Sequence, residues 1–382
     1  MTSQLGTEGS VSVRPLTDSE EDFQSVWILW SEIFPEWPIE EALLRTILGH
    51  PFLARQGRHF ISTTTTTTTS SSNETTPTGF ILTYLGDGGE GKKGFVSVVG
   101  VLPQYRGRGV GGKLLERGVG ALRGAAGEGK EEGREIKIVI GSETPRFWPG
   151  LPVEFGENVK AWFGKRGFKK SDGPTIKDLF KDIRTEVVPP GVKRVDGTAE
   201  EKKLRFAPWS ESGYQECMEK QGANFSWGKA YAVLAASNQY HEVMVAFDAE
   251  TNDQLGWTLM CGPDAILKDM FAFMPITGDV AFAGGDEKVG GLGAGGGEGE
   301  EMRKEKRKIG LIAAVGVDKK ARGRGVGLAM VVRAMENLKE RGMEGIFIDS
   351  VAIRDFYEKL GFEMRWEYES WESVEGGEGK CN

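Results

Sequence analysis

The chain has 382 residues, 39% hydrophobic and 27% charged, which suffices for sizeable cores and excludes a wholly disordered protein. At roughly 150 residues per domain, this length predicts two or three domains. The formal net charge of −8 argues against nucleic acid as the main partner. Three scattered cysteines exclude a disulfide framework or a cysteine-based zinc site, and with only three histidines we expect no metal site.

Residues 1–10 are polar and lack the apolar stretch of a secretory signal. The longest apolar run, residues 309–317, is too short to cross a bilayer. We therefore expect a cytoplasmic protein without a membrane partner. The sequence leaves its oligomeric state open.

The first half begins with a strand at residues 12–16, followed by an acidic stretch and apolar residues at helical spacing from Phe23 to Trp30. The remaining elements predicted here are strands at 59–62, 79–85 and 136–140 and helical stretches at 112–123 and 159–168. Between the first two of these strands, the threonines and serines of residues 63–72 are interpreted as a polar loop.

The second half follows residues 184–203, whose Pro-Pro-Gly run marks an interdomain linker. Its predicted elements are a strand at 205–209, a helix at 211–221, a β-hairpin at 242–247 and 254–260, a strand at 309–317, a helix at 328–341, a strand at 345–349 and a helical stretch at 353–362. The Gly-rich, charged residues 284–308 are interpreted as an inserted loop.

An internal repeat relates the two halves. Residues 98–111 (VVGVLPQYRGRGVG) and 314–327 (AVGVDKKARGRGVG) agree at nine of fourteen positions. The elements that follow also correspond in order, so two copies of one domain are predicted. We place the domains at residues 11–183 and 204–374, with the linker at 184–203.

Each copy places the run Arg-Gly-Arg-Gly-Val-Gly between a β-rich stretch and an amphipathic helix. Glycines allow a tight turn that brings several N–H groups together, and the helix dipole adds to their field, so the loop suits a pyrophosphate. Two alternatives are a turn without a ligand and a dinucleotide-binding unit. The latter is opposed by the missing third glycine of GxGxxG.

The run Val-x-Val, then Arg-x-x-Gly-x-Gly, and later Phe-Tyr-Glu-Lys-Leu-Gly-Phe (356–362) resembles the acetyl-CoA-binding core of the GNAT superfamily of N-acetyltransferases. The resemblance spans most of both halves. It implies an α/β fold in each copy, with a mixed, mainly antiparallel sheet flanked by helices, and acetyl-CoA as cofactor. It also implies a bulge that separates the strand before the loop from its parallel neighbour.

The resemblance and the loop together predict the acetyl-CoA contacts. In the second copy these are Val315, Val317, Arg322, Gly323, Arg324, Gly325, Val326, Gly327 and Phe356. In the first copy they are Val99, Val101, Arg106, Gly107, Arg108, Gly109 and Gly111.

Further runs, at residues 145–152, 262–264, 269–275, 312–317 and 347–351, resemble the tandem-GNAT glucosamine and glucosaminide N-acetyltransferases. Ser350 departs from that pattern, because a tryptophan is expected after the aspartate. The resemblance implies a small-molecule amine, an amino sugar, as acceptor. The alternatives are another amine, such as a protein N-terminus, lysine, aminoglycoside or polyamine, and an acyl-CoA-binding sensor without turnover.

Acetyl transfer needs a proton donor for the leaving thiolate and a group that orients the amine. Tyr357 is the candidate acid, since an ordinary tyrosine pKa near 10 keeps it protonated at neutral pH. Asp349, at the end of a predicted strand, is the candidate partner of the amine. Glu344 and Asp355 are lesser alternatives. A further set of side chains that could stack on a sugar or belong to the core is Trp148, Trp257 and Trp366.

The first copy lacks both candidate groups. Phe163 aligns with Tyr357, and its strand at 136–140 ends in Gly141 where the second copy has Asp349, with Glu143 two residues late. We therefore expect turnover in the second domain. The first domain is expected to support it, with a loop able to hold acetyl-CoA.

Overall fold

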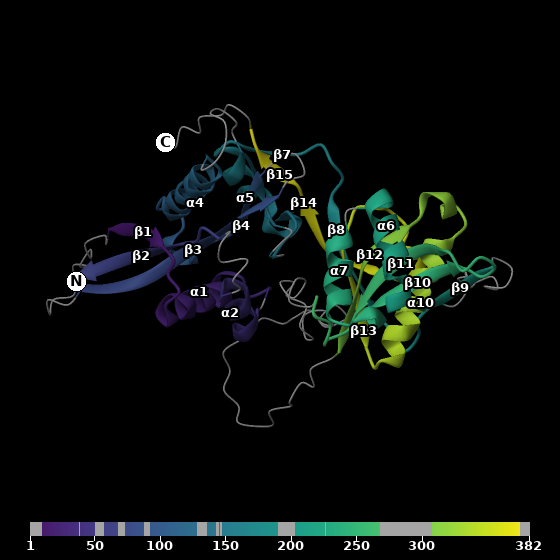
Figure 1. Ribbon diagram of the computed structural model, residues 1–382. Coiled ribbons are helices and arrows are strands. Elements are labelled where there is room, and N and C mark those ends of the chain that lie inside the picture. Colours follow the sequence, from purple (N-terminus) through teal and green to yellow (C-terminus); the bar gives the residue numbers. More distant parts are fainter. Residues whose placement is uncertain are drawn as a thin grey trace, which may run out of the picture. The chain divides into compact units, whose positions relative to one another are not determined.

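The computed structural model describes residues 10–37, 39–49, 57–67, 73–87, 92–127, 136–142, 145, 147–189, 203–225, 227–267 and 308–374 (Figure 1). The chain divides into two compact units. The first consists of Met1–Thr175, Phe273–Pro275 and Tyr368–Asn382, and the second of Ile176–Ala272 and Ile276–Glu367.

The first unit is built on a seven-stranded sheet of order β1-β2-β3-β4-β5-β15-β7, in which only β4 and β5 run parallel. The strands are β1 (Val11–Pro15), β2 (Phe60–Thr67), β3 (Asn73–Asp87), β4 (Lys92–Val101), β5 (Lys137–Ile140), β7 (Phe168–Lys170) and β15 (Trp371–Ser373). The helices are α1 (Glu20–Ile33), α2 (Glu41–Gly49), α4 (Val110–Gly127) and α5 (Gly156–Gly164), with short turns η1 (Pro103–Tyr105) and η2 (Val153–Phe155). Figure 1 shows α4 and α5 on one side of the sheet and α1 and α2 on the other.

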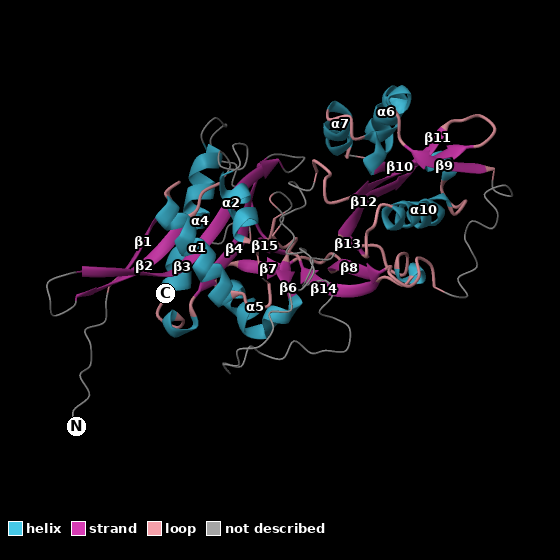
Figure 2. Ribbon diagram, turned by 90° about the horizontal axis from the view of Figure 1, so that it is seen from below, coloured by secondary structure: helices cyan, strands magenta, loops and turns pink. Residues whose placement is uncertain are grey.

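The second unit repeats this plan, with the strand order β14-β8-β13-β12-β11-β10-β9 and β12 parallel to β13. The strands are β8 (Ile176–Asp182), β9 (Leu204–Pro208), β10 (Val243–Asp248), β11 (Gln254–Cys261), β12 (Ile309–Val317), β13 (Gly345–Val351) and β14 (Glu363–Glu369). The helical elements are α6 (Tyr214–Asn224), α7 (Gly228–Ala236), α10 (Val326–Glu340), η3 (Glu211–Gly213), η4 (Tyr240–Glu242), η5 (Lys319–Ala321) and η6 (Glu358–Leu360). Figure 2 shows α6 and α7 on one face of the sheet and α10 on the other. The predicted α/β fold with mixed, mainly antiparallel sheets is confirmed.

Each unit contains a strand from the other half of the sequence. In the first unit β15 lies between β5 and β7, and in the second β8 pairs with β13. The two-residue strand β6 (Leu151–Pro152) pairs with Tyr368 and Glu369, all within the first unit. The compact units therefore differ from the expected ranges 11–183 and 204–374, because 176–182 and 371–373 complete sheets that begin elsewhere in the chain.

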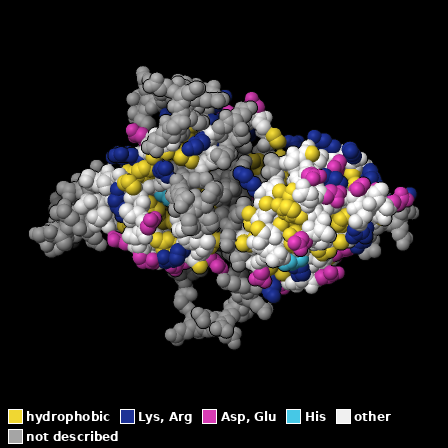
Figure 3. All heavy atoms as spheres, in the orientation of Figure 1, with side chains coloured by type: hydrophobic (Ala, Val, Ile, Leu, Met, Phe, Trp, Pro, Cys, Tyr) yellow, Lys and Arg dark blue, Asp and Glu magenta, His cyan; other side chains and the backbone are white. Residues whose placement is uncertain are grey.

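Apolar cores lie on both faces of the second sheet. The spacing expected for α10 places Val331, Val332 and Met335 in the core on its side. On the opposite face, Tyr231 and Leu234 of α7 are fully buried. Hydrophobic side chains also gather on the outer surface over α7 (Figure 3), where Trp227 and Val233 are exposed. None of the helices in the described residues combines the length and apolar character needed to span a membrane.

Two local predictions were wrong, and one helix was missed. The threonines at 63–67, expected in a loop, belong to β2, in keeping with the β propensity of β-branched side chains. The helical stretch expected at 353–362 is a bend followed by η6, and Asp355 has a φ of 55°, which a helix cannot contain. Helix α7 was not foreseen.

Within the expected linker, Val187 and Val188 pack against the core beside α10. Residues 190–202, 268–307 and Glu143 lie outside the described residues.

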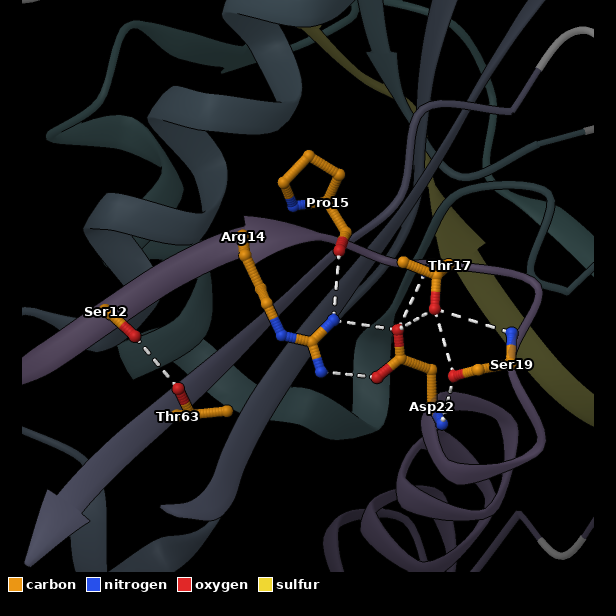
Figure 4. A network of polar contacts seen from close by, with 7 residues as sticks. All are labelled: Ser12, Arg14, Pro15, Thr17, Ser19, Asp22 and Thr63. Atoms are coloured by element: carbon orange, nitrogen blue, oxygen red, sulfur yellow. Dashed lines mark hydrogen bonds and ion pairs between the residues drawn. The ribbon is translucent and has the colours of Figure 1, made fainter. Parts of the chain in front are cut away.

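A polar network joins β1 to α1 in the first unit (Figure 4). Arg14 donates to both carboxylate oxygens of the buried Asp22, over 2.8 and 2.5 Å. Thr17 donates to the same carboxylate through its N–H and its hydroxyl. Ser19 is the N-cap and accepts from the Asp22 N–H. These bonds fix where α1 leaves the strand.

Candidate active site

The glycine loops of the two units have the same backbone conformation. The φ angles are 79° and 75° at Gly323 and Gly325, and 76° and 80° at Gly107 and Gly109. These lie in the left-handed region that glycine adopts without strain. A Cβ at Gly107, Gly109 or Gly323 would meet nothing within 4 Å. Among the described residues no side chain caps α10 at Gly325, so its first-turn N–H groups remain available to an anion.

The first arginine of each loop is tied to the preceding strand. Arg322 donates through Nε to the Val317 carbonyl over 3.1 Å, and Arg106 does the same to Val101 over 2.9 Å. Arg324 lies 3.9 Å from the carboxylate of Asp248. The first arginines therefore hold the loop against the strand while keeping positive charge beside it.

The strand before the second loop carries the expected bulge. The parallel ladder between β12 and β13 runs from Ile309 to Ile312, and its last described pair is Ile312 with Ile348. On the other side, the register with β11 shifts between the pairs Leu259–Ala313 and Trp257–Gly316, which leaves an extra residue in β12. The two parallel strands thus separate at this bulge, just before Val315 and Val317, as the resemblance implies.

Asp349 and Tyr357 lie near one another beside this separation. Asp349 follows Ile348 directly and is half-buried. Tyr357 is buried, and its burial, together with the Asp349 charge, raises the pKa of Tyr357 well above its ordinary value of 10. A tyrosine in this setting stays protonated at neutral pH. The two predicted catalytic side chains are therefore brought within electrostatic reach of each other.

Phe356 connects Tyr357 to the loop. Its ring meets that of Tyr357 edge-on at 4.8 Å, and a Cβ at Gly327 would lie 3.4 Å from it. In the first unit, Trp162 lies in the same way 3.2 Å from a Cβ at Gly111. The structure thus supports the alignment of residues 162–163 with 356–357. Val326, also predicted to contact acetyl-CoA, is buried at the start of α10.

Ser350 stands in a second irregularity, on β13. Its φ is 51°, and its N–H donates to the buried Asp178 over 3.0 Å. A bulky side chain is strained at this φ. The backbone of this chain therefore disfavours the tryptophan that the resemblance led us to expect here.

The three candidate tryptophans are buried. Trp257 is fully buried and donates to Gln254, while Trp148 stacks on Trp30 in an aromatic cluster of the first unit. Trp366 is 7% exposed and packs against Phe347. They belong to the cores. Of the lesser alternatives for the amine partner, Glu344 precedes β13 and Asp355 is exposed.

In the first unit, backbone occupies the position of Asp349. Gly141 follows Ile140 there with a φ of 96°, and a Cβ on it would lie 2.6 Å from the nitrogen of Gly150. Ser142 donates its N–H to the Trp148 carbonyl over 2.8 Å, which holds this segment in place. Phe163, opposite Tyr357, is buried and has no hydroxyl.

Sequence reasoning missed the polar side chains that surround the β12 bulge. Tyr231 donates to the carbonyl of Ala314 over 3.2 Å, and Thr258 donates to that of Ala313 over 3.1 Å. Asn224 accepts from the N–H of Lys319, at the start of the loop. No motif marks these residues, because each acts on backbone atoms distant in sequence.

Comparisons with known families agree with this geometry. Residues 23–130 match a model described as the acetyltransferase (GNAT) family, and residues 279–364 match one described as the acetyltransferase (GNAT) domain. The chain contains two GNAT domains. Acetyl-CoA is the cosubstrate of this family.

A stretch of 71 residues is 34% identical to an uncharacterized N-acetyltransferase of Methanocaldococcus jannaschii. It covers 18% of this chain and 31% of that protein, so the chain spans about a third of this relative.

Two solved structures superpose over most of this chain. The glucosamine N-acetyltransferase region of a fungal multi-domain beta-N-acetylglucosaminidase superposes with a TM-score of 0.73 at 23% identity, over 96% of this chain and 38% of that one. A tandem GNAT protein from the clavulanic acid biosynthesis pathway superposes with a TM-score of 0.57 at 14% identity, over 95% and 98% of the chains. At these identities the likeness shows the fold of the GNAT domains.

Proposed function

We propose that the second GNAT domain transfers an acetyl group from acetyl-CoA to the amino group of an amino sugar, such as glucosamine or a short glucosaminide. The observation that carries this proposal is the placement of Asp349 and Tyr357 beside the β12 bulge, next to an uncapped glycine loop. The acceptor class is supported by the sequence runs shared with amino-sugar N-acetyltransferases and by the structural likeness to a glucosamine N-acetyltransferase region.

The residues present fit acetyl-CoA. The loop N–H groups from Gly323 to Gly327 and the charge of Arg322 suit its pyrophosphate, and Val315 and Val317 line the strand beside the bulge. When bound, acetyl-CoA supplies the acetyl group as a thioester. Tyr357 holds a proton at its hydroxyl for the leaving sulfur, and Asp349 offers a carboxylate that orients the amine.

The first domain is assigned a supporting role. Its loop has the same backbone conformation as the loop of the second domain, so it can hold a second acetyl-CoA. The loop residues are Arg106, Gly107, Arg108, Gly109 and Gly111. The first domain has a phenylalanine and a glycine where the second domain has its acid and its carboxylate. This favours a binding module over a second catalyst.

The test is a panel of amines assayed with acetyl-CoA by release of free thiol. We expect glucosamine or a short glucosaminide to give the highest kcat/KM, above lysine peptides, aminoglycosides and spermidine. Equal rates for glucosamine and spermidine would refute the amino-sugar acceptor. Tight binding of acetyl-CoA without thiol release for any amine would instead support the sensor.

A further inference from the structure

The β12 bulge holds a strained residue in place. Ala314 has a φ of 49°, a conformation that residues other than glycine rarely adopt. Such a conformation persists only where surrounding contacts determine it. The carbonyls of Ala313 and Ala314 each accept a side-chain hydrogen bond, from Thr258 and Tyr231. The bulge is therefore fixed from two sides.

The Tyr231 hydroxyl is a permanent donor. The side chain is fully buried, and burial raises its pKa well above the ordinary 10, so the hydroxyl keeps its proton at neutral pH. Gln221 of α6 lies beside it and is also fully buried. The Tyr231 hydroxyl donates to the carbonyl of Ala314, the strained residue of β12, and the Gln221 side chain is its other polar neighbour.

Apolar side chains lie on both sides of α7. The outer face also carries apolar side chains, since Trp227 and Val233 are exposed (Figure 3). The inward face carries Tyr231 and Leu234. The inward face also carries the hydrogen bond from Tyr231 to β12.

Peptide geometry shows what these bonds orient. In a trans peptide the C=O and the following N–H point in opposite directions. Because the Ala313 carbonyl accepts from the Thr258 hydroxyl, the Ala314 N–H points away from that hydroxyl. The Ala314 carbonyl is held by Tyr231 in the same way, which orients the N–H of Val315.

We propose that Tyr231 is a positioning residue of the second domain: with Thr258, it holds Ala314 in its left-handed conformation and so aims the bulge N–H groups at the acyl carbonyl. This inference rests on the proposed function and adds Tyr231 and Thr258 to the residues that serve it. An N–H donor that is preorganised in this way stabilises negative charge on a carbonyl oxygen without moving.

The first domain shows what the bulge looks like without such a device. Its β4 bulge falls at Ser97, and no described residue of β4 has a positive φ. Ser97 is buried, and its hydroxyl has no hydrogen-bond partner within the described part of the chain. The strained, side-chain-locked bulge thus occurs in the domain that also holds Asp349 and Tyr357.

The test compares Tyr231→Phe, which removes only the hydroxyl, with Tyr240→Phe as a matched control. Tyr240 packs against the same core cluster, and its ring lies 5.1 Å from Trp209. We expect Tyr231→Phe to speed amide hydrogen exchange in residues 313–317 of the unliganded protein. We also expect it to lower kcat by about ten- to a hundredfold with an unchanged Kd for CoA, because only the reacting end is displaced. Tyr240→Phe should change none of these quantities.

Ala314→Gly supplies the rescue. Glycine adopts a φ near 50° without strain, so in the Tyr231→Phe background it should restore part of kcat. If Tyr231→Phe lowers only the Tm, or if Ala314→Gly restores nothing, Tyr231 is merely a core residue and the inference is wrong. If the wild-type protein releases no thiol with any amine, the proposed function fails. Unchanged exchange in residues 313–317 overturns the positioning role whatever the activity.

Discussion

The two GNAT domains are alike in backbone where an anion would bind and different in side chains where an amine would arrive. Both loops have two glycines with φ near 75–80°, a first arginine bonded to the strand carbonyl and an aromatic ring over the first helical turn. Beyond the loop the domains diverge. Asp349 and Tyr357 of the second domain correspond to Gly141 and Phe163 of the first.

Under the proposed division of labour, this difference separates the features that depend on the fold from those that depend on single side chains. Loop N–H groups at a helix N-terminus depend on glycine and on the helix, so a second copy keeps them as long as it keeps its fold. A proton donor and an orienting carboxylate are single side chains that one substitution removes. In the first domain the freed position is filled by backbone, since Gly141 lies against residues 148–150. The position can no longer accept a carboxylate.

The largest expected effect concerns Tyr357, the proposed proton donor of the second domain, which is matched by Phe163 in the first. Tyr357→Phe should lower kcat by about 10²–10⁴-fold, the usual contribution of a positioned proton donor, with little change in the Tm. Phe163→Tyr is the matched control, and it should leave kcat unchanged because no carboxylate accompanies it. Steady-state thiol release measures both variants. Near-normal turnover by Tyr357→Phe, together with loss of turnover in Arg106→Ala, would place catalysis in the first domain.

The pH profile tests the same residue without a substitution. Burial and the Asp349 charge raise the pKa of Tyr357, so the hydroxyl is protonated at every pH below 10. We expect kcat/KM to rise with pH as the amine loses its proton, and to show no fall below pH 10. A basic limb with a midpoint near 8 or 9 would contradict Tyr357 as the acid.

The next effect concerns Gly141 of the first domain, at the position that corresponds to Asp349. Gly141→Ala should lower the free energy of unfolding by about 3 kcal/mol, since it adds positive-φ strain and a Cβ 2.6 Å from backbone. The control is Gly167→Ala in the same domain. Gly167 has a φ of 80° but nothing within 4 Å of its Cβ position, so only the strain of about 1 kcal/mol remains. Urea denaturation that gives equal losses for the two variants would show that the position is not filled.

A smaller effect distinguishes how each domain anchors its first helix. In the first domain Arg14 and Thr17 hold the pKa of Asp22 at about 2 (Figure 4), whereas in the second Glu216 accepts from the Gln254 N–H and from Lys220. Asp22→Asn should therefore lower the free energy of unfolding at pH 7 by about 1–2 kcal/mol, allowing for the exposure of Arg14.

The sign of its pH dependence follows from the lowered pKa. The stabilisation is complete above the ordinary value near 3.8 and is lost as the pH falls toward 2, so wild type and Asp22→Asn should converge there. The exposed Asp18→Asn is the control, with no expected change at either pH. A constant gap between wild type and Asp22→Asn from pH 7 to pH 2 would mean that lost packing, not charge, explains the destabilisation.

The parts of the fold that follow from local patterns could be predicted from the sequence. Alternating residues identified β10 and β11, helical spacing identified α10, and the repeated glycine loop revealed two domains. The exchange of β8 and β15 could not be foreseen, because a three-residue strand at 371–373 finds its place only through pairing partners some 200 residues away.

The same limit applies to the candidate site: its local motifs could be predicted from the sequence, and its long-range hydrogen bonds could not. The loop and the positions of Asp349 and Tyr357 follow from motifs, whereas the bonds from Tyr231 and Thr258 join a helix and a strand to backbone carbonyls. A carbonyl is present at every residue, so nothing in the sequence marks the one that a distant hydroxyl reaches. The bend at residues 353–357 was missed for a related reason, since Asp355 adopts a positive φ that its residue type permits but does not require.

The smallest effect tests whether both loops bind. An alanine at Gly109 or Gly325 is strained by about 1 kcal/mol in the left-handed region, so the free loop relaxes out of this conformation and CoA binding must restore it, which raises the Kd at that loop by about fivefold. Titration calorimetry of the wild-type protein should give two sites per chain, and each variant should weaken one of them. Gly325→Ala should also raise the KM for acetyl-CoA, whereas Gly109→Ala should leave turnover unchanged, because Phe163 and Gly141 give its domain no acid and no carboxylate. One site in the wild-type protein that only Gly325→Ala weakens would show that the first loop keeps its conformation without a ligand.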